Sequence, residues 1–124
     1  MTVQDTLQAL GITRNYRGCI RAITAIELAM ENEDRLEAVT KEIYREVAKR
    51  CGCNWSAVER NIRTVVQRAW RINRPLLIRM AGYPLEVPPT ASEFIAIVAN
   101  YIQRTSPKQD DPAPADAAKV KVPR

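Results

Sequence analysis

Apolar residues recur at spacings of three and four from residue 3 to residue 104, and this pattern restricts the fold more than any other feature of the chain. Such spacing gathers the apolar side chains on one face of a helix. The expected helices cover residues 3–10, 17–32, 35–50, 54–71 and 90–104. A sixth, shorter helix is expected between Pro75 and Gly82. Strand patterning is absent apart from a few β-branched residues around 85–87, so the sequence predicts an all-α, compact six-helix domain.

Two polar patterns predict where helices begin. Asn54 and Ser56 are both favourable N-caps, and Ser56 with Glu59 three residues later fits a capping box. Thr90 with Glu93 fits a second capping box. The helices that start near residues 54 and 90 therefore have the best defined predicted beginnings.

The composition changes sharply after Ser106. Four prolines, adjacent aspartates at 110 and 111 and many alanines leave few apolar side chains that could pack. We therefore predict one domain over residues 1–105 and a disordered tail over residues 106–124.

Charge and cysteine content limit the class of protein. The chain has 19 Lys and Arg against 14 Asp and Glu, a net charge of +5, which favours a polyanionic partner such as nucleic acid or an anionic membrane surface. No apolar stretch approaches the roughly 18 residues that a bilayer requires, and the N-terminus lacks the pattern of a signal peptide. Three cysteines argue against a disulfide framework. These features predict a cytoplasmic protein without a membrane partner.

Two classes of chemistry find little support in the sequence. The chain has no histidine, so three cysteines cannot complete a closed four-ligand zinc site, and no metal or cofactor is predicted. It also has no glycine-rich phosphate loop and no pair of carboxylates suited to acid-base catalysis. We therefore do not expect an enzyme.

Residues 41–71 fit the plan of a helix-turn-helix, in which the second helix lies in the major groove of DNA. Gly52 supplies the turn, and Ala48 is small where the two helices must cross closely. An apolar residue stands at Ile62 and not at Asn61, so the packing beyond the first turn is expected to differ from the simplest form of the motif.

Positive charge is concentrated on the same unit. Residues 41–79 contain ten Lys or Arg and three Glu, a local charge of +7, so the rest of the chain sums to −2. A concentrated positive field of this kind is typical of a surface that binds the phosphates of nucleic acid.

The helix expected at 54–71 has two faces. Its predicted buried stripe consists of Val58, Ile62, Val65, Val66 and Ala69. Its predicted exposed face consists of Ser56, Arg60, Arg63, Thr64, Gln67 and Arg71. Arginine can donate two hydrogen bonds to guanine and glutamine can pair with adenine, so we expect this face to contact base edges from its first turns. The candidates for phosphate contacts are Lys41, Lys49, Arg68, Arg71 and Arg74. The alternative interpretation is the solvated face of a bundle helix.

Two longer strings carry a resemblance to a known family. They read Val58-Glu59-Arg60-x-Ile62-Arg63, followed by Ala69-Trp70, and Pro89-Thr90-x-Ser92-Glu93-Phe94-Ile95-Ala96. With both strings in this order, residues 7–104 resemble the C-terminal effector domain of the sporulation-initiation response regulator (stage 0 sporulation protein A) of endospore-forming bacteria. The resemblance implies six helices, the fourth of which enters the major groove, and tandem copies bound to adjacent promoter boxes as a homodimer.

The resemblance also implies roles for single residues. It assigns DNA contacts to Glu59, Arg60 and Arg63, and Glu59 could accept a hydrogen bond from a cytosine amino group. The alternative role of Glu59 is the capping box with Ser56. Trp70 matches as well, and its place at the end of the apolar stripe predicts a core position.

Three departures from the family pattern change what we expect. Ala57 stands where the family has a basic residue, and the bulky Trp55 precedes Ser56, so one base contact is expected to be lost or changed. The segment at 76–83, which in the family contacts RNA polymerase, is altered apart from Gly82-Tyr83. The receiver domain of the family is absent from these 124 residues, and the start at Met1 together with the unusual tail favours a stand-alone relative over an excised fragment.

Two functions follow from this reasoning. The first is a sequence-specific regulator of transcription that binds double-stranded DNA. The second is a protein-interaction module of the same fold, which binds another regulator or its DNA-bound paralogue and has little DNA specificity. A salt titration of DNA binding separates them, because only the first predicts affinity that falls steeply with salt.

Overall fold

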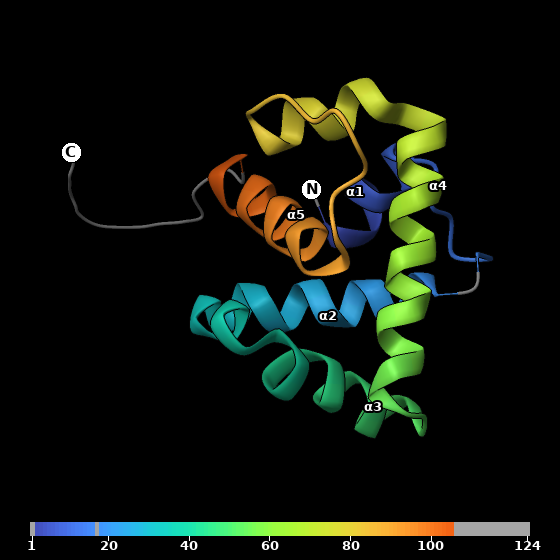
Figure 1. The fold of residues 1–124 in the computed structure, drawn as a ribbon, viewed down its shortest axis with the longest axis vertical. Helices are drawn as coiled ribbons and strands as arrows, with labels where there is room; N and C mark the ends of the chain where they lie inside the picture. Colours follow the sequence, from blue (N-terminus) through green and yellow to red (C-terminus); the bar gives the residue numbers. More distant parts are fainter. Residues whose placement is uncertain (1, 17, 106–124) are drawn as a thin grey trace.

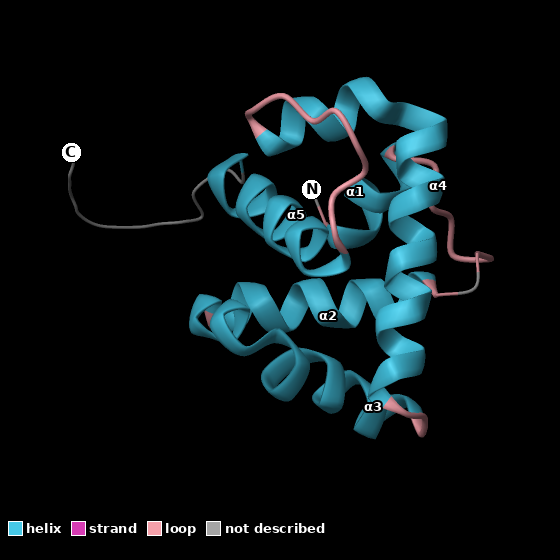
Figure 2. Cartoon of the chain, viewed as in Figure 1, coloured by secondary structure: helices cyan, strands magenta, loops and turns pink. Residues whose placement is uncertain are grey.

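The computed structural model describes residues 2–16 and 18–105, and all regular structure in these ranges is helical (Figures 1 and 2). The elements are α1 (Val3–Ala9), α2 (Cys19–Glu31), the 3₁₀ helix η1 (Glu33–Ala38), the π-helix η2 (Thr40–Tyr44), α3 (Arg45–Cys51), α4 (Trp55–Ala81) and α5 (Ala91–Thr105). The predicted all-α, six-helix fold is confirmed, with η1, η2 and α3 forming one helical run and a kink dividing α4 in two. The tail predicted for residues 106–124 lies outside the described residues.

The core lies where α4 crosses α2 and α5 (Figure 1). Helix α5 buries the side that its spacing predicted, through Phe94, Ile95, Ile97, Val98 and Ile102. Its predicted capping box is confirmed, since the Thr90 amide donates to Glu93 Oε1 at 2.8 Å and the Glu93 amide donates to Thr90 Oγ1 at 3.1 Å. These bonds satisfy amides that the first turn of a helix leaves unpaired.

Helix α2 faces the core with small side chains. Its buried residues are Cys19, Ala22, Ala25, Ile26, Leu28 and Ala29. Ile20 belongs to the predicted apolar pattern but is 49% exposed, because the helix is rotated so that Cys19 and Ala22 point inward. Small side chains on this face let neighbouring helices approach closely, and the spacing of large apolar residues alone did not predict that orientation.

The helix predicted at 35–50 is helical throughout but not regular. It is divided into η1, η2 and α3. No residue of η1 is fully buried, although Leu36 is half-buried and packs against the core. The wider π-turn of η2 lets two successive large residues, Ile43 and Tyr44, both become buried. The prediction of a single regular α-helix was therefore wrong in the type of helix.

Helix α4 begins two residues earlier than a Ser56 cap would require. Asn54 is the N-cap residue in extended conformation, and the helix starts at Trp55, so Ser56 lies inside the first turn. The predicted capping box between Ser56 and Glu59 was therefore wrong. Glu59 instead pairs with Arg63, whose Nη2 lies 2.8 Å from Glu59 Oε1.

A kink at Asn73 turns the second part of α4 back across the domain (Figure 1). Asn73 leaves the helical region with φ −147° and ψ 63°, and its Nδ2 donates to the Ala9 carbonyl at 3.0 Å. Pro75 lacks the amide that would donate to the Arg71 carbonyl, so the sequence favours a break here. The short helix predicted after Pro75 is thus present and ends at Gly82, as expected.

None of the helices within residues 2–16 and 18–105 combines the length and the apolar character that crossing a bilayer requires.

Candidate DNA interface

The turn between α3 and α4 is closed at Gly52. Gly52 adopts φ 70° and ψ 39°, and the amides of Gly52 and Cys53 both donate to the Ala48 carbonyl, the second at 3.0 Å. No atom lies within 4 Å of the place where a Cβ on Gly52 would be, so only the left-handed backbone favours glycine here. Ala48 is 6% exposed at the crossing of the two helices, as its size predicted. The segment has the geometry of a helix-turn-helix.

Helix α4 separates its two faces as the sequence predicted. The buried stripe consists of Val58, Ile62, Val65, Val66 and Ala69. The opposite face is exposed and consists of Ser56, Arg60, Arg63, Thr64, Gln67 and Arg71. A rigid helix fixed by its apolar side therefore presents these polar side chains to solvent; whether they contact bases stays a prediction.

Of the two arginines among the candidate base contacts, Arg60 is the less constrained. Its side chain is exposed and has no hydrogen-bond or ion-pair partner among the described residues. Its carbonyl accepts a hydrogen bond from Thr64 Oγ1 at 3.0 Å, which holds the Thr64 hydroxyl against the helix. Arg60 can thus reorient toward a ligand without breaking a contact of its own.

Glu59 and Arg63 form an ion pair along the same face. The side chains are 35% and 56% exposed, so the pair contributes less than about 1 kcal/mol to stability. Tyr44 of η2 is buried near this pair, and burial, followed by the charge of Glu59, raises the pKa of Tyr44 to about 12, with Arg63 opposing the shift. The Tyr44 phenol is therefore neutral at physiological pH and adds no charge to the surface.

The candidate phosphate contacts on α4 differ in what already holds them. Arg71 is exposed and has no partner among the residues described. Arg68 is half-buried, donates from Nε to the Gly11 carbonyl at 2.9 Å and lies 4.9 Å from the centre of the Tyr16 ring. The Arg74 guanidinium lies 4.3 Å from the centre of the Trp70 ring.

The two lysine candidates lie before α4. Lys41 is exposed in η2 and Lys49 is exposed in α3. Trp70, predicted to belong to the core, is half-buried and packs against it.

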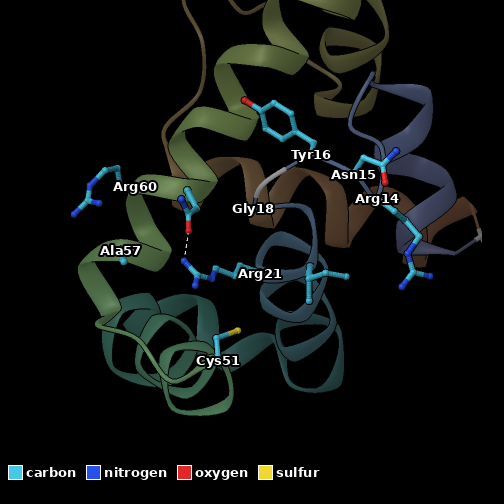
Figure 3. Close-up of a pocket in the computed structure, with 10 residues that line it drawn as sticks. Arg14, Asn15, Tyr16, Gly18, Arg21, Cys51, Ala57 and Arg60 are labelled. Carbon is cyan, nitrogen blue, oxygen red and sulfur yellow. Dashed lines mark hydrogen bonds between the residues drawn. The ribbon is translucent and has the colours of Figure 1, made fainter.

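A basic cleft beside α4 escaped the sequence reasoning. It has a volume of about 640 Å³ and lies between the loop that follows α1, the start of α2 and the first turns of α4 (Figure 3). Its lining includes Arg14, Arg21 and Arg60. Arg21 Nη1 donates to Oδ1 of Asn61, which is the polar residue that stood where the simplest motif has an apolar one. That unexpected asparagine was the only signal in the sequence.

Comparison with known families agrees with this geometry. A family model described as "Sporulation initiation factor Spo0A C terminal" matches residues 3–102, which include all of the candidate interface. This family is one of DNA-binding transcription regulators and is not a known enzyme family. The chain therefore belongs to the Spo0A C-terminal family, whose members are DNA-binding effector domains of transcription regulators.

Proposed function

We propose that this chain is a sequence-specific regulator that reads double-stranded DNA with the exposed face of the first part of α4. The observation that carries the proposal is Arg60, an exposed guanidinium with no hydrogen-bond or ion-pair partner among the described residues. It lies beside the Glu59–Arg63 pair on a helix whose other side is buried in the core. Pre-positioned polar groups on a rigid helix suit base recognition, because few degrees of freedom are lost when they bind.

We assign base contacts to Ser56, Glu59, Arg60, Arg63, Thr64 and Gln67. Arginine pairs with guanine, glutamine with adenine and glutamate with the amino group of cytosine. Ala57 has no group that could reach a base, and Trp55, 40% exposed, stands next to the reading face. The preferred box should therefore differ from that of relatives with a basic residue at the position of Ala57.

We assign backbone contacts to Lys41, Lys49, Arg68, Arg71 and Arg74. Such contacts hold the domain in register on the duplex without reading its sequence. A domain over residues 1–105, contacts with RNA polymerase or a paralogous regulator, and a homodimer on tandem sites remain predictions of the sequence and the resemblance. Binding to chromosomal DNA would place the protein in the cytoplasm.

Selection of bound sequences from random duplexes tests the proposal, followed by a salt titration on the selected duplex and a scrambled one. The expected result is an enriched sequence whose binding constant falls linearly in a plot of log affinity against log salt. Arg79→Ala serves as the control variant in the titration. It removes one exposed positive charge from the part of α4 beyond the kink, so it should bind like the wild type. A chain that enriches no sequence and binds no duplex would support the protein-interaction module instead.

A further inference from the structure

The basic cleft beside α4 is closed at its base by contacts between the start of α2 and α4. The helix α2 can approach α4 there because residue 18 is glycine: a Cβ on Gly18 would lie 3.3 Å from both Cβ and the carbonyl oxygen of Asn61, and Gly18 has φ 95°. This close approach places Arg21 in reach of Asn61, and the hydrogen bond between them holds the half-buried guanidinium in the cleft.

The loop that forms one wall is fixed to α4 as well. Arg68 reaches from α4 to the Gly11 carbonyl and stacks on Tyr16, which lines the cleft. Arg68 thus fixes two described residues of the loop, Gly11 and Tyr16, to α4. A wall fixed in this way keeps its position relative to the reading face.

Three arginines line the cleft: Arg14, Arg21 and Arg60. In Figure 3, Arg21 lies between Arg60, which extends outward from α4, and Arg14, which extends outward from the loop before α2. Arg14 is exposed and has no partner among the described residues. No acidic side chain is among the described residues that line the cleft. Ala57 also lines the cleft, so the cleft adjoins the position where relatives have a basic residue and this chain has none.

We propose that Arg14 and Arg21 bind the DNA backbone beside the box that α4 reads, so that the loop before α2 and the start of α2 form a second, phosphate-binding edge of the interface. Guanidinium groups match phosphate oxygens in geometry and charge, and a fixed guanidinium loses little freedom on binding. Asn61 is the positioning residue for Arg21. This inference rests on the proposed function, because it requires a duplex in contact with the same face.

The experiment measures affinity against salt concentration for the full chain on the selected duplex and on a scrambled duplex of the same length. Arg14→Ala and Arg21→Gln should each reduce the slope of log affinity against log salt by about one on both duplexes. The affinity gap to the wild type should therefore shrink about 3.5-fold between 50 and 200 mM salt, as one phosphate contact requires. Arg79→Ala should leave the slope unchanged.

A second arm places the contact on the DNA. A methylphosphonate replaces one backbone phosphate at a time on either side of the box, and one flanking position should weaken the wild type but not Arg21→Gln. Thermal unfolding of Arg21→Gln checks the fold, and Arg14→Ala needs no such check because Arg14 has no described contact to lose.

The inference is overturned if both variants keep the wild-type slope while the wild type binds its selected duplex. If the wild type binds no duplex at all, the proposed function fails first, so the two failures are distinguishable.

Discussion

The first thirteen residues of α4 carry two arginines and the last fourteen carry four, and the two sets are held differently. In the reader half, residues 55–67, Arg60 and Arg63 are exposed, and the one ion pair lies within the helix surface. In the anchored half, residues 68–81, Arg68 is bonded to the Gly11 carbonyl and Arg74 covers Trp70. The two halves therefore differ in what already holds their guanidinium groups, and not only in charge.

The difference has an energetic consequence. An arginine without a protein partner loses only rotamer freedom when it binds DNA, whereas an arginine held against the protein must also give up or share its contacts. Within the described residues, Arg68 donates a hydrogen bond from Nε alone. Its two terminal nitrogens can therefore still donate to a phosphate. The solvated arginines of the reader half are thus suited to bind bases in place of water. The arginines of the anchored half that contact the protein are suited to hold the helix in position.

The largest expected effect is on the anchored half. Gly11→Ala would place a Cβ 2.5 Å from Ile72 Cγ2 at a backbone φ of 93°, so strain and overpacking should lower the free energy of unfolding by about 2–4 kcal/mol. Gly52→Ala is the matched control at φ 70° with no neighbour within 4 Å, and should cost about 1–2 kcal/mol. Denaturant unfolding measures both, and equal losses would contradict the tight contact.

Removal of Arg60 tests the reader half. Arg60→Ala should weaken binding to the selected duplex by about 1–3 kcal/mol and relax the preference at one base position. Its unfolding curve should match that of the wild type, because the guanidinium has no partner among the described residues. Titration against duplexes with single base changes gives the measurement, and an unchanged preference would remove Arg60 from the base contacts.

Arg68 is both a candidate phosphate contact and a structural contact between α4 and the loop after α1. Arg68→Ala removes the bond to Gly11 and the stacking on Tyr16, so it should lower the free energy of unfolding by about 1–2 kcal/mol. Arg71→Ala should change stability by less than about 0.5 kcal/mol, since Arg71 is exposed and unpartnered in the described structure. Two equally stable variants would contradict the structural role assigned to the contacts of Arg68.

The smallest effect concerns the phosphate role of Arg71. Arg71→Ala should weaken all duplexes alike and reduce the salt slope by about one, because one phosphate contact releases about one counterion. Fluorescence anisotropy across a salt series measures it. A loss confined to one base position would instead make Arg71 a base contact.

Local patterns predicted what local chemistry determines. The stripe of α4 and the buried side of α5 follow from apolar spacing, and the box of Thr90 with Glu93 follows from two side chains three residues apart. The exposure of Arg60 and Arg63 follows from the same spacing. Their roles on DNA stay predictions.

Long-range contacts decided what the sequence could not predict. Arg21 and Asn61 are separated by 40 residues in the sequence, and Arg68 and Gly11 by 57. No local sequence pattern therefore predicts either contact. The Ser56 cap failed because two adequate N-caps stand close together, and the helix begins after Asn54. The 3₁₀ and π turns before α3 share the apolar spacing of an α-helix, so periodicity does not distinguish them.

Side-chain NMR shows whether residues 55–67 of α4 enter a DNA groove. The isotope-labelled chain is titrated with its selected duplex while the Nε–H signals of its arginines are followed. If these residues enter the groove, the signals of Arg60 and Arg63 shift strongly while that of Arg79 stays unmoved. Saturating binding that leaves Arg60 and Arg63 unshifted would contradict their entry into the groove.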